Sequence, residues 1–306
     1  MKISLRGVSK SFGSTHALRS VTLEFSEGVN LLLGPNGSGK TTLINVLAGI
    51  TYPDSGTITI DGLEFRAERR GEWRKGVRLL TSRMGLLSDK PGYPPNYSGL
   101  DLLRFSIPPE ADPDDAKEWL HEIIGTLEME GYISRRIAGY SSGMVQRLGV
   151  AASLVARPSL ILWDEPIANL DAKSRLAVVE LAKKVVSAGS TLIVASHILA
   201  EFEPVTNWLG IMRLGEMVVS GTIDELGGTT GTYLAETDSP VELARVLLEH
   251  GVVKSLTLGP DSVRFVMEEN RDFALESLIG GSGIRVRSLR RELMKPSEIY
   301  RKYEAV

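Results

Sequence analysis

Short apolar runs separated by turn residues set the pattern of the first two thirds of the chain. Val29–Leu33, Leu160–Trp163 and Thr191–Ser196 are such runs, and polar or turn-forming residues follow each of them. Continuous apolar runs of this length are typical of strands buried on both faces of a parallel sheet. Pro113–Ile124 instead has an acidic start and apolar residues at helical spacing, which predicts an amphipathic helix. The pattern indicates an α/β domain.

The pattern changes after residue 226. Gly227–Gly231 contains only glycine and threonine, which is the composition of a linker. Beyond it we expect the order strand, helix, strand, strand, helix, strand, which is that of a small α+β, ferredoxin-like domain. The chain is therefore expected to form two domains, residues 1–226 and residues 227–306. The strands predicted in the second are 232–236, 253–258, 262–267 and 284–289, and the helices are 240–250 and 272–279.

The composition excludes several classes of protein. Hydrophobic residues make up 42% and charged residues 24% of the chain, as in an ordinary globular protein. The net charge of -3 argues against a general nucleic-acid binder, and the absence of cysteine excludes disulfides and thiolate metal sites. No run reaches the roughly 18 apolar residues of a membrane span, and the N-terminus lacks the apolar core of a signal peptide. We therefore expect a cytoplasmic chain.

A glycine-rich loop joins the strand Val29–Leu33 to a predicted helix, and it matches the pattern G-x-x-x-x-G-K-[ST]. In such a loop the glycines let backbone N–H groups point at phosphate oxygens, and the helix N-terminus adds positive partial charge. Lys40 can then reach the β- and γ-phosphates, and the Thr41 hydroxyl can bind Mg²⁺. The residues expected to bind nucleotide are Gly34, Pro35, Asn36, Gly37, Ser38, Gly39, Lys40, Thr41 and Thr42.

Polar residues also follow the next two predicted strands. Asp164 and Glu165 come directly after Leu160–Trp163, and His197 follows Thr191–Ser196. Because the carboxyl ends of parallel strands meet at one edge of a sheet, these side chains are expected to face the glycine-rich loop. Asp164 would then hold Mg²⁺ through its water shell, and Glu165 would act as the general base on the attacking water. His197 would contact the γ-phosphate.

The segment Tyr140–Arg147, with the sequence Tyr-Ser-Ser-Gly-Met-Val-Gln-Arg, adds a family resemblance. It resembles the LSGGQ signature of the ABC transporter ATPases. Ser141 and Gly143 match the serine and the second glycine, whereas Ser142 and Met144 replace the first glycine and the glutamine. The resemblance implies that Ser141 and Gly143 face the γ-phosphate of an ATP molecule held by a second subunit. The same residues also fit a capped helix start, which has this geometry without a ligand.

Further motifs extend the resemblance over roughly residues 1–226. Phe12 stands where the family places an aromatic ring against adenine, and His197 stands at the position of its switch histidine. Ala168–Asp171 matches the segment that crosses the dimer axis in the family. The resemblance implies a P-loop NTPase fold, the ABC cassette, with a mixed sheet core and a helical arm at about residues 98–139.

One motif of the family is missing. The family places a glutamine near Mg²⁺, at the end of the strand that follows its first long helical region. We predict that strand at Val77–Thr81, so that Ser82 takes the place of the glutamine beside the metal. The loop that couples to the membrane subunit is then expected at Met84–Tyr97.

The resemblance implies an ATPase that uses ATP and Mg²⁺. Two copies of the chain, or this chain and a related ATPase subunit, would hold ATP head to tail. They would drive transport, with export expected, through a separate transmembrane permease at the inner face of the cell membrane. No nucleic-acid partner is expected.

Two alternatives remain open. A soluble ABC ATPase acting on ribosomes or nucleic acid would generally carry two cassettes or a coiled-coil insertion, whereas this sequence has one glycine-rich phosphate loop. A regulator that binds nucleotide without hydrolysing it would not need both Glu165 and His197.

Overall fold

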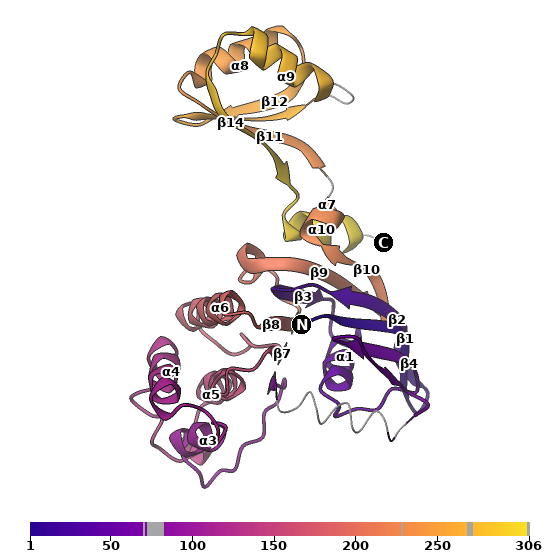
Figure 1. Ribbon diagram of the computed structural model, residues 1–306, viewed down its shortest axis with the longest axis vertical. Coiled ribbons are helices and arrows are strands. Elements are labelled where there is room, and N and C mark those ends of the chain that lie inside the picture. The colour runs from indigo at the N-terminus through magenta and orange to yellow at the C-terminus, as the bar shows by residue number, and fades with distance from the viewer. Residues whose placement is uncertain (70, 72–82, 228, 268–271, 305–306) are drawn as a thin grey trace. The chain divides into compact units, whose positions relative to one another are not determined.

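The computed structural model describes residues 1–69, 71, 83–227, 229–267 and 272–304 (Figure 1). The chain divides into two compact units. The first consists of Met1–Thr222 together with the chain from Tyr300 on, and the second is Ile223–Ile299. In the described residues no helix combines the length and the apolar character that a bilayer crossing requires.

The central sheet of the first unit carries the predicted strand ends. Its strand order is β10-β9-β3-β8-β7-β6, with β6, β7, β8, β3 and β9 parallel and β10 antiparallel to β9. Every residue of β3, β7 and β8 is buried, as their continuous apolar runs predict. The sheet is therefore mixed, as expected. Its strands are β3 (Val29–Leu33), β6 (Met84–Leu87), β7 (Leu160–Asp164), β8 (Thr191–Ser196), β9 (Thr206–Arg213) and β10 (Glu216–Thr222).

A second, antiparallel sheet packs on the same core. Its order is β2-β1-β4-β5, formed by β1 (Ile3–Phe12), β2 (Thr15–Phe25), β4 (Ser55–Ile60) and β5 (Leu63–Arg66). Buried and exposed residues alternate at the end of β2, as in a sheet with one solvated face. Helix α1 (Lys40–Leu47) joins the two sheets, because its Leu43 and Ile44 belong to one core cluster with Leu5 of β1 and Leu162 of β7.

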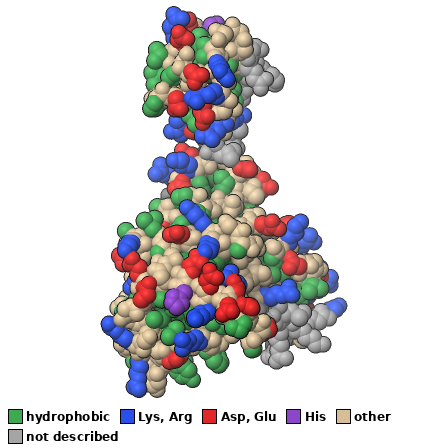
Figure 2. All heavy atoms as spheres, turned by 60° about the vertical axis from the view of Figure 1, so that its left-hand side comes forward, with side chains coloured by type: hydrophobic (Ala, Val, Ile, Leu, Met, Phe, Trp, Pro, Cys, Tyr) green, Lys and Arg blue, Asp and Glu red, His purple; other side chains and the backbone are tan. Residues whose placement is uncertain are grey.

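Four helices lie together beside the central sheet (Figure 1). They are α3 (Gly99–Phe105), α4 (Pro113–Thr126), α5 (Ser142–Leu154) and α6 (Ala172–Ser187). Each begins after a capping side chain, which accepts a backbone N–H of the first turn: Ser98, Asp112, Ser141 and Asp171. Two 3₁₀ turns, η1 (Ile137–Gly139) and η2 (Glu203–Val205), complete the connections. Where Figure 2 displays the described residues, acidic and basic side chains are interspersed.

The expected loop Met84–Tyr97 is wrong at its start. Met84–Leu87 forms strand β6, which pairs in parallel with β7 from Met84 opposite Leu160 to Leu87 opposite Trp163. Gly85 hides this strand in the sequence, because glycine is a poor strand former. Its place has a packing reason, since a Cβ on Gly85 would lie 1.8 Å from the carbonyl oxygen of Ser153 in α5. The predicted strand Val77–Thr81 lies outside the described residues.

The second unit contains a four-stranded antiparallel sheet in the order β12-β13-β11-β14. The order along the chain is βαββαβ, as expected for the ferredoxin-like arrangement. Helices α8 and α9 lie on the same side of this sheet (Figure 1). The predicted linker is wrong, because residues 223–227 form α7 and residues from 229 belong to β11. The elements are α7 (Ile223–Gly227), β11 (Thr229–Thr237), α8 (Pro240–Glu249), β12 (Val253–Leu258), β13 (Ser262–Met267), α9 (Asp272–Gly281), β14 (Val286–Leu293) and the start of α10 (Pro296–Glu304), whose residues from Tyr300 on belong to the first unit.

Candidate nucleotide-binding and catalytic site

The glycine-rich loop connects the end of β3 to the start of α1. Gly37 and Gly39 have φ of 81° and 106°, values at which a side chain would be strained. A Cβ on Gly39 would also lie 2.5 Å from the carbonyl oxygen of Ala17, whereas nothing lies within 4 Å of the Cβ position of Gly37. Gly39 caps α1 without a side-chain hydrogen bond, so the backbone N–H groups of this helix start remain available to an anion.

A cavity of about 470 Å³ opens in front of this loop. It lies at the carboxyl ends of β3, β7 and β8, where the polar residues of the motifs were predicted to meet. The structure thus brings Lys40 and Thr41 together with Glu165 and His197. The lining residues are Thr15, His16, Ala17, Asn36, Gly37, Ser38, Gly39, Lys40, Thr41, Thr42, Asp89, Glu165, Ala168 and His197.

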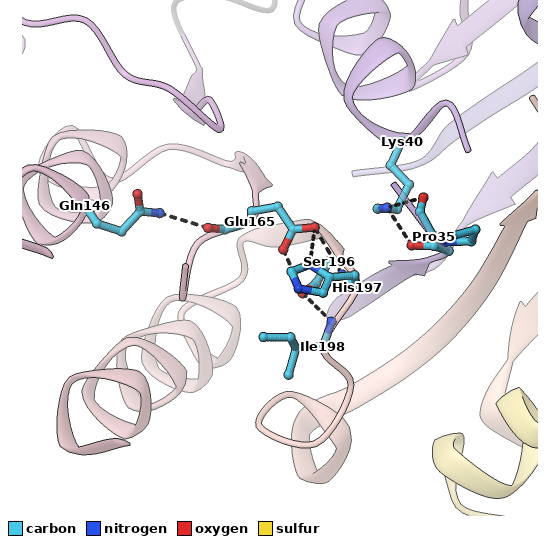
Figure 3. Close-up of polar contacts among 8 residues, drawn as sticks. Pro35, Lys40, Gln146, Glu165, Ser196, His197 and Ile198 are labelled. Carbon is cyan, nitrogen blue, oxygen red and sulfur yellow. Dashed lines mark hydrogen bonds and ion pairs between the residues drawn. The ribbon is translucent and has the colours of Figure 1, made fainter. Parts of the chain in front are cut away.

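The Lys40 ammonium folds back on its own loop. Its Nζ donates hydrogen bonds to the carbonyl oxygens of Gly34 at 2.7 Å and Pro35 at 3.2 Å (Figure 3). Burial lowers the pKa of Lys40, and the negative charges of Glu165 and Asp164 oppose this effect. Both carbonyl bonds can be exchanged for bonds to phosphate oxygens, to which an ammonium offers three donors.

Asp164 ends β7 as a carboxylate that is only 2% exposed. Its Oδ1 has no hydrogen-bond partner among the described residues. Burial raises the pKa of Asp164, the Thr41 side chain acts against this, and the charges of Asp89 and Glu165 raise the pKa further. A buried anion with a free oxygen beside a threonine hydroxyl fits a hard divalent cation, which prefers oxygen ligands.

Glu165 has an unusual backbone and a fully engaged side chain. Its φ is 51°, in the left-handed region that few residues other than glycine adopt. Its Oε1 lies 2.9 Å from His197 Nδ1 and accepts the His197 backbone N–H at 3.1 Å (Figure 3). The Ser196 hydroxyl donates to Oε2 at 3.3 Å. Sequence reasoning predicted Glu165 and His197 but missed Ser196, a buried residue inside the apolar run of β8.

Two predicted nucleotide ligands, Ser141 and Gly143, do not line this cavity. Ser141 is the N-cap of α5, and its Oγ accepts the Met144 backbone N–H at 3.3 Å. The structure therefore contains the capped helix start that both interpretations of the motif predict. Within one chain, this helix start is separate from the described lining of the cavity, and its role toward nucleotide stays a prediction.

Phe12 also lies outside the described lining of the cavity. It ends β1 with 54% of its surface exposed, and the Lys10 ammonium lies 5.3 Å from the centre of its ring. Thr15 and His16, on the other side of the same hairpin, do line the cavity. Phe12 is thus close in sequence to two lining residues, but its ring does not line the cavity. Its stacking on adenine stays a prediction.

Asp89 is another site residue that the sequence pattern did not reveal. It follows the end of β6, borders the cavity and raises the pKa of Asp164 through its charge. The resemblance places a glutamine at the end of the strand that follows the first long helical region, whereas Asp89 follows β6, which pairs with β7. Ser82, predicted for that role, lies outside the described residues. The available signal was the polar pair Ser88-Asp89 after a short apolar run, which Gly85 interrupts.

Comparisons with known proteins agree with this geometry. The family model described as ABC transporter matches residues 18–168. An uncharacterized ABC transporter ATP-binding protein of Nostoc sp. is 34% identical over 71% of this chain and 63% of its own length. The bacitracin transport ATP-binding protein BcrA of Enterococcus faecalis is 27% identical over 90% of both chains. The daunorubicin resistance ATP-binding protein DrrA3 of Streptomyces coeruleorubidus is 30% identical over 75% of this chain and 71% of its own.

Solved structures give the same fold. The dimeric structure of MJ0796, described as a bacterial ABC transporter cassette, superposes with a TM-score of 0.63 at 24% identity. The match covers 72% of this chain and 98% of that one. The glycine-rich loop, the acidic strand end and His197 therefore lie in a cassette fold, and both the sequence and the structure match this family. The chain belongs to the ABC transporter family and is one of its ATP-hydrolysing, ATP-binding subunits.

Proposed function

We propose that two copies of this chain close head to tail on two ATP molecules and drive export through a separate transmembrane permease. The observation that carries this proposal is the separation of the site into two parts. The cavity gathers Lys40, Glu165 and His197, whereas Ser141 stands at the start of α5 outside its described lining. A second copy would supply the Ser141 side, since a helix N-terminus with a serine hydroxyl suits a phosphate.

The residues beside the glycine-rich loop fit the Mg²⁺ that the family implies. Thr41 and Asp164 would hold it, because Asp164 combines a buried carboxylate with an oxygen that has no partner among the described residues. A bound Mg²⁺ would neutralise charge on the phosphate oxygens. The Thr41 side chain also lowers the pKa of Asp164, which indicates that the two side chains lie close together.

The remaining side chains have separate chemical tasks. Lys40 would exchange its bonds to Gly34 and Pro35 for bonds to the phosphates. Glu165 would accept a proton from the attacking water as that water bonds to the γ-phosphorus and the bond from the γ-phosphorus to the β–γ bridging oxygen breaks, with ADP as the leaving group. His197 lies against Glu165 at 2.9 Å, so it can fix the orientation of that carboxylate and donate toward the γ-phosphate.

The helical arm offers the surface for the permease. Phe105, at the end of α3, is 85% exposed, and an apolar cavity of about 540 Å³ lies between α3 and α4. Large exposed apolar groups of this kind mark interaction surfaces. The resemblance assigns the permease contact to this arm, which would place the chain at the inner face of the cell membrane. Apolar lining residues of the cavity include Leu100, Ile107, Leu120, Ile124 and Ile133.

The transport relatives favour this reading over action on ribosomes or nucleic acid. BcrA carries transport in its name and matches 90% of this chain. The mixed charges on the face in Figure 2 also differ from the continuous basic surface that phosphate backbones require.

Complementation between two inactive variants tests the head-to-tail arrangement. Lys40→Ala removes the phosphate-binding ammonium, and Ser141→Arg blocks the other face. Each homodimer should lack ATPase activity, because every site then contains one defect. A one-to-one mixture should regain activity, up to about a quarter of the wild-type value, since random pairing of subunits makes half of the dimers mixed and each mixed dimer has one intact site beside a defective one.

Two results would argue against the arrangement. Full activity of Ser141→Arg alone would show that one chain completes its own site. A mixture with no more activity than either variant alone, in which mass spectrometry detects mixed dimers, would show that the two faces do not meet. A mixture of Lys40→Ala with Lys40→Met, in which no intact site can form, serves as the control.

A further inference from the structure

Gln146 is the only glutamine in the chain, and it is 3% exposed. It lies in the second turn of α5, and its Nε2 donates a hydrogen bond of 2.9 Å to the backbone carbonyl of Glu165 (Figure 3). Figure 3 shows this bond on the opposite side of Glu165 from its contacts with Ser196 and His197. A single buried side chain thus joins α5 to the backbone of the catalytic residue.

The backbone at Glu165 needs such support. A residue other than glycine is strained in the left-handed region, and the surrounding contacts must offset that strain. The Glu165 N–H donates to the Ala195 carbonyl at 2.8 Å, and the Glu165 carbonyl accepts hydrogen bonds from Gln146 Nε2 at 2.9 Å and from the Ala168 backbone N–H at 3.2 Å. Both peptide groups that flank the unusual φ of 51° are therefore fixed, one by β8 and the other by α5. A shift of α5 would act on Glu165 through the second bond.

The first turn of α5 carries the other relevant residue. Ser141 caps this helix, five residues before Gln146, and the proposed function places Ser141 against the ATP held by the second copy. The same helix would then contact one ATP at its start and hold the glutamate that serves the other ATP. We infer that Gln146 is a positioning residue through which occupancy of one ATP site orients Glu165 in the other. This inference rests on the head-to-tail dimer of the proposed function.

A matched control on the same helix distinguishes positioning of Glu165 by Gln146 from a purely structural role of Gln146. Ser153 is also buried in α5, and its Oγ accepts a hydrogen bond of 2.8 Å from Trp163 Nε1 in β7. Ser153→Ala removes a buried polar link between α5 and β7 without touching Glu165. Gln146→Met keeps the side-chain length and removes the donor. Gln146→Glu keeps the shape and also removes the donor when it is ionised.

The experiment measures the MgATP dependence of hydrolysis for the wild type and these three variants. The wild type should show a Hill coefficient above one, because one occupied site prepares the other. Gln146→Met and Gln146→Glu should lower kcat at least about tenfold and bring the Hill coefficient to about one. The half-saturating ATP concentration should change by no more than about twofold, since Gln146 does not line the cavity. Ser153→Ala should keep both the Hill coefficient and kcat.

The inference is overturned if both Gln146 variants keep the wild-type Hill coefficient and kcat. Equal losses in Ser153→Ala would overturn it as well, because they would reflect general loosening of α5. Failure of the proposed function looks different: a Glu165→Gln chain would then bind ATP without forming a dimer. When Glu165→Gln does dimerise, the double variant Glu165→Gln/Gln146→Met should dimerise too. This result would show that Gln146 positions Glu165 and is not needed for dimer formation.

Discussion

At the scale of single residues, Asp164 is a buried carboxylate whose ionisation destabilises the folded protein. Its carboxylate is 2% exposed, and one of its oxygens lacks a partner in the described part of the chain. An ionised group in such surroundings destabilises the folded protein unless a cation compensates it. The free-energy cost of burying this carboxylate is consistent with a residue that binds a metal and does not stabilise the fold.

Asp164→Asn should therefore stabilise the nucleotide-free protein by about 1 to 3 kcal/mol and abolish hydrolysis. Because burial raises the pKa of Asp164, the folded state favours the protonated carboxyl. Ionisation weakens the folded state as the pH rises from the ordinary carboxyl range through the raised pKa. The advantage of Asn should thus be present at pH 7 and disappear in acid. Thermal unfolding at several pH values checks this, and a pH-independent difference would contradict it.

Residues that the sequence alone revealed share one property. Lys40, Glu165 and His197 belong to motifs that are contiguous in the chain or follow an obvious strand, so local pattern was sufficient. Asp89 and Gln146 act through a neighbouring strand and a neighbouring helix. Their roles depend on which elements pack together, and a sequence read one segment at a time does not contain that information.

At the scale of elements, the contact between β6 and α5 positions one side of the cavity. Gly85 permits that contact, since its Cβ position lies 1.8 Å from the Ser153 carbonyl oxygen and 2.9 Å from the Pro158 ring. The Ser153 backbone cannot move aside to accommodate a Cβ, as a flexible side chain could. Strand β6, which leads to Asp89 at the cavity, therefore requires glycine at position 85.

Gly85→Ala should destabilise the protein by about 1 to 3 kcal/mol, because β6 must move away from α5. Displacement of β6 should also move Asp89 and raise the half-saturating ATP concentration. Thermal unfolding and ATP titration measure the two effects. Gly92→Ala is the matched control, since nothing lies within 4 Å of its Cβ position, and equal stability of the two variants would contradict the packing argument.

The same scale shows where element prediction works. The fully buried strands β3, β7 and β8 appear in the sequence as uninterrupted apolar runs, and the structure confirms them. The glycines at 227 and 231 predicted a linker, but sheet pairing overrides that local preference. Pairing of Thr229 with Leu293 extends β11 into this segment. Pairing partners far away in sequence decide such segments.

At the scale of the whole molecule, the ferredoxin-like unit has its own core around Phe265, Leu247 and Ala235. Arginines on its sheet are paired with acids: Arg264 with Glu292, Arg287 with Asp238 and Asp261, and Arg290 with Glu236. Such pairing reduces the local positive charge that would attract phosphate or lipid. The domain limits at 226 and 227 remain a proposal, and the structure divides its compact units four residues earlier.

At this scale the protein is proposed to form a dimer that closes on ATP. The most direct test is the solution mass of Glu165→Gln, measured by light scattering with and without MgATP. This variant keeps the side-chain shape of Glu165 but removes its base, so ATP should persist and hold two chains together. We expect the mass of one chain without nucleotide and of two chains with MgATP, and adding Ser141→Arg should abolish the dimer. A mass of one chain at saturating MgATP, with ATP binding shown separately, would contradict the account.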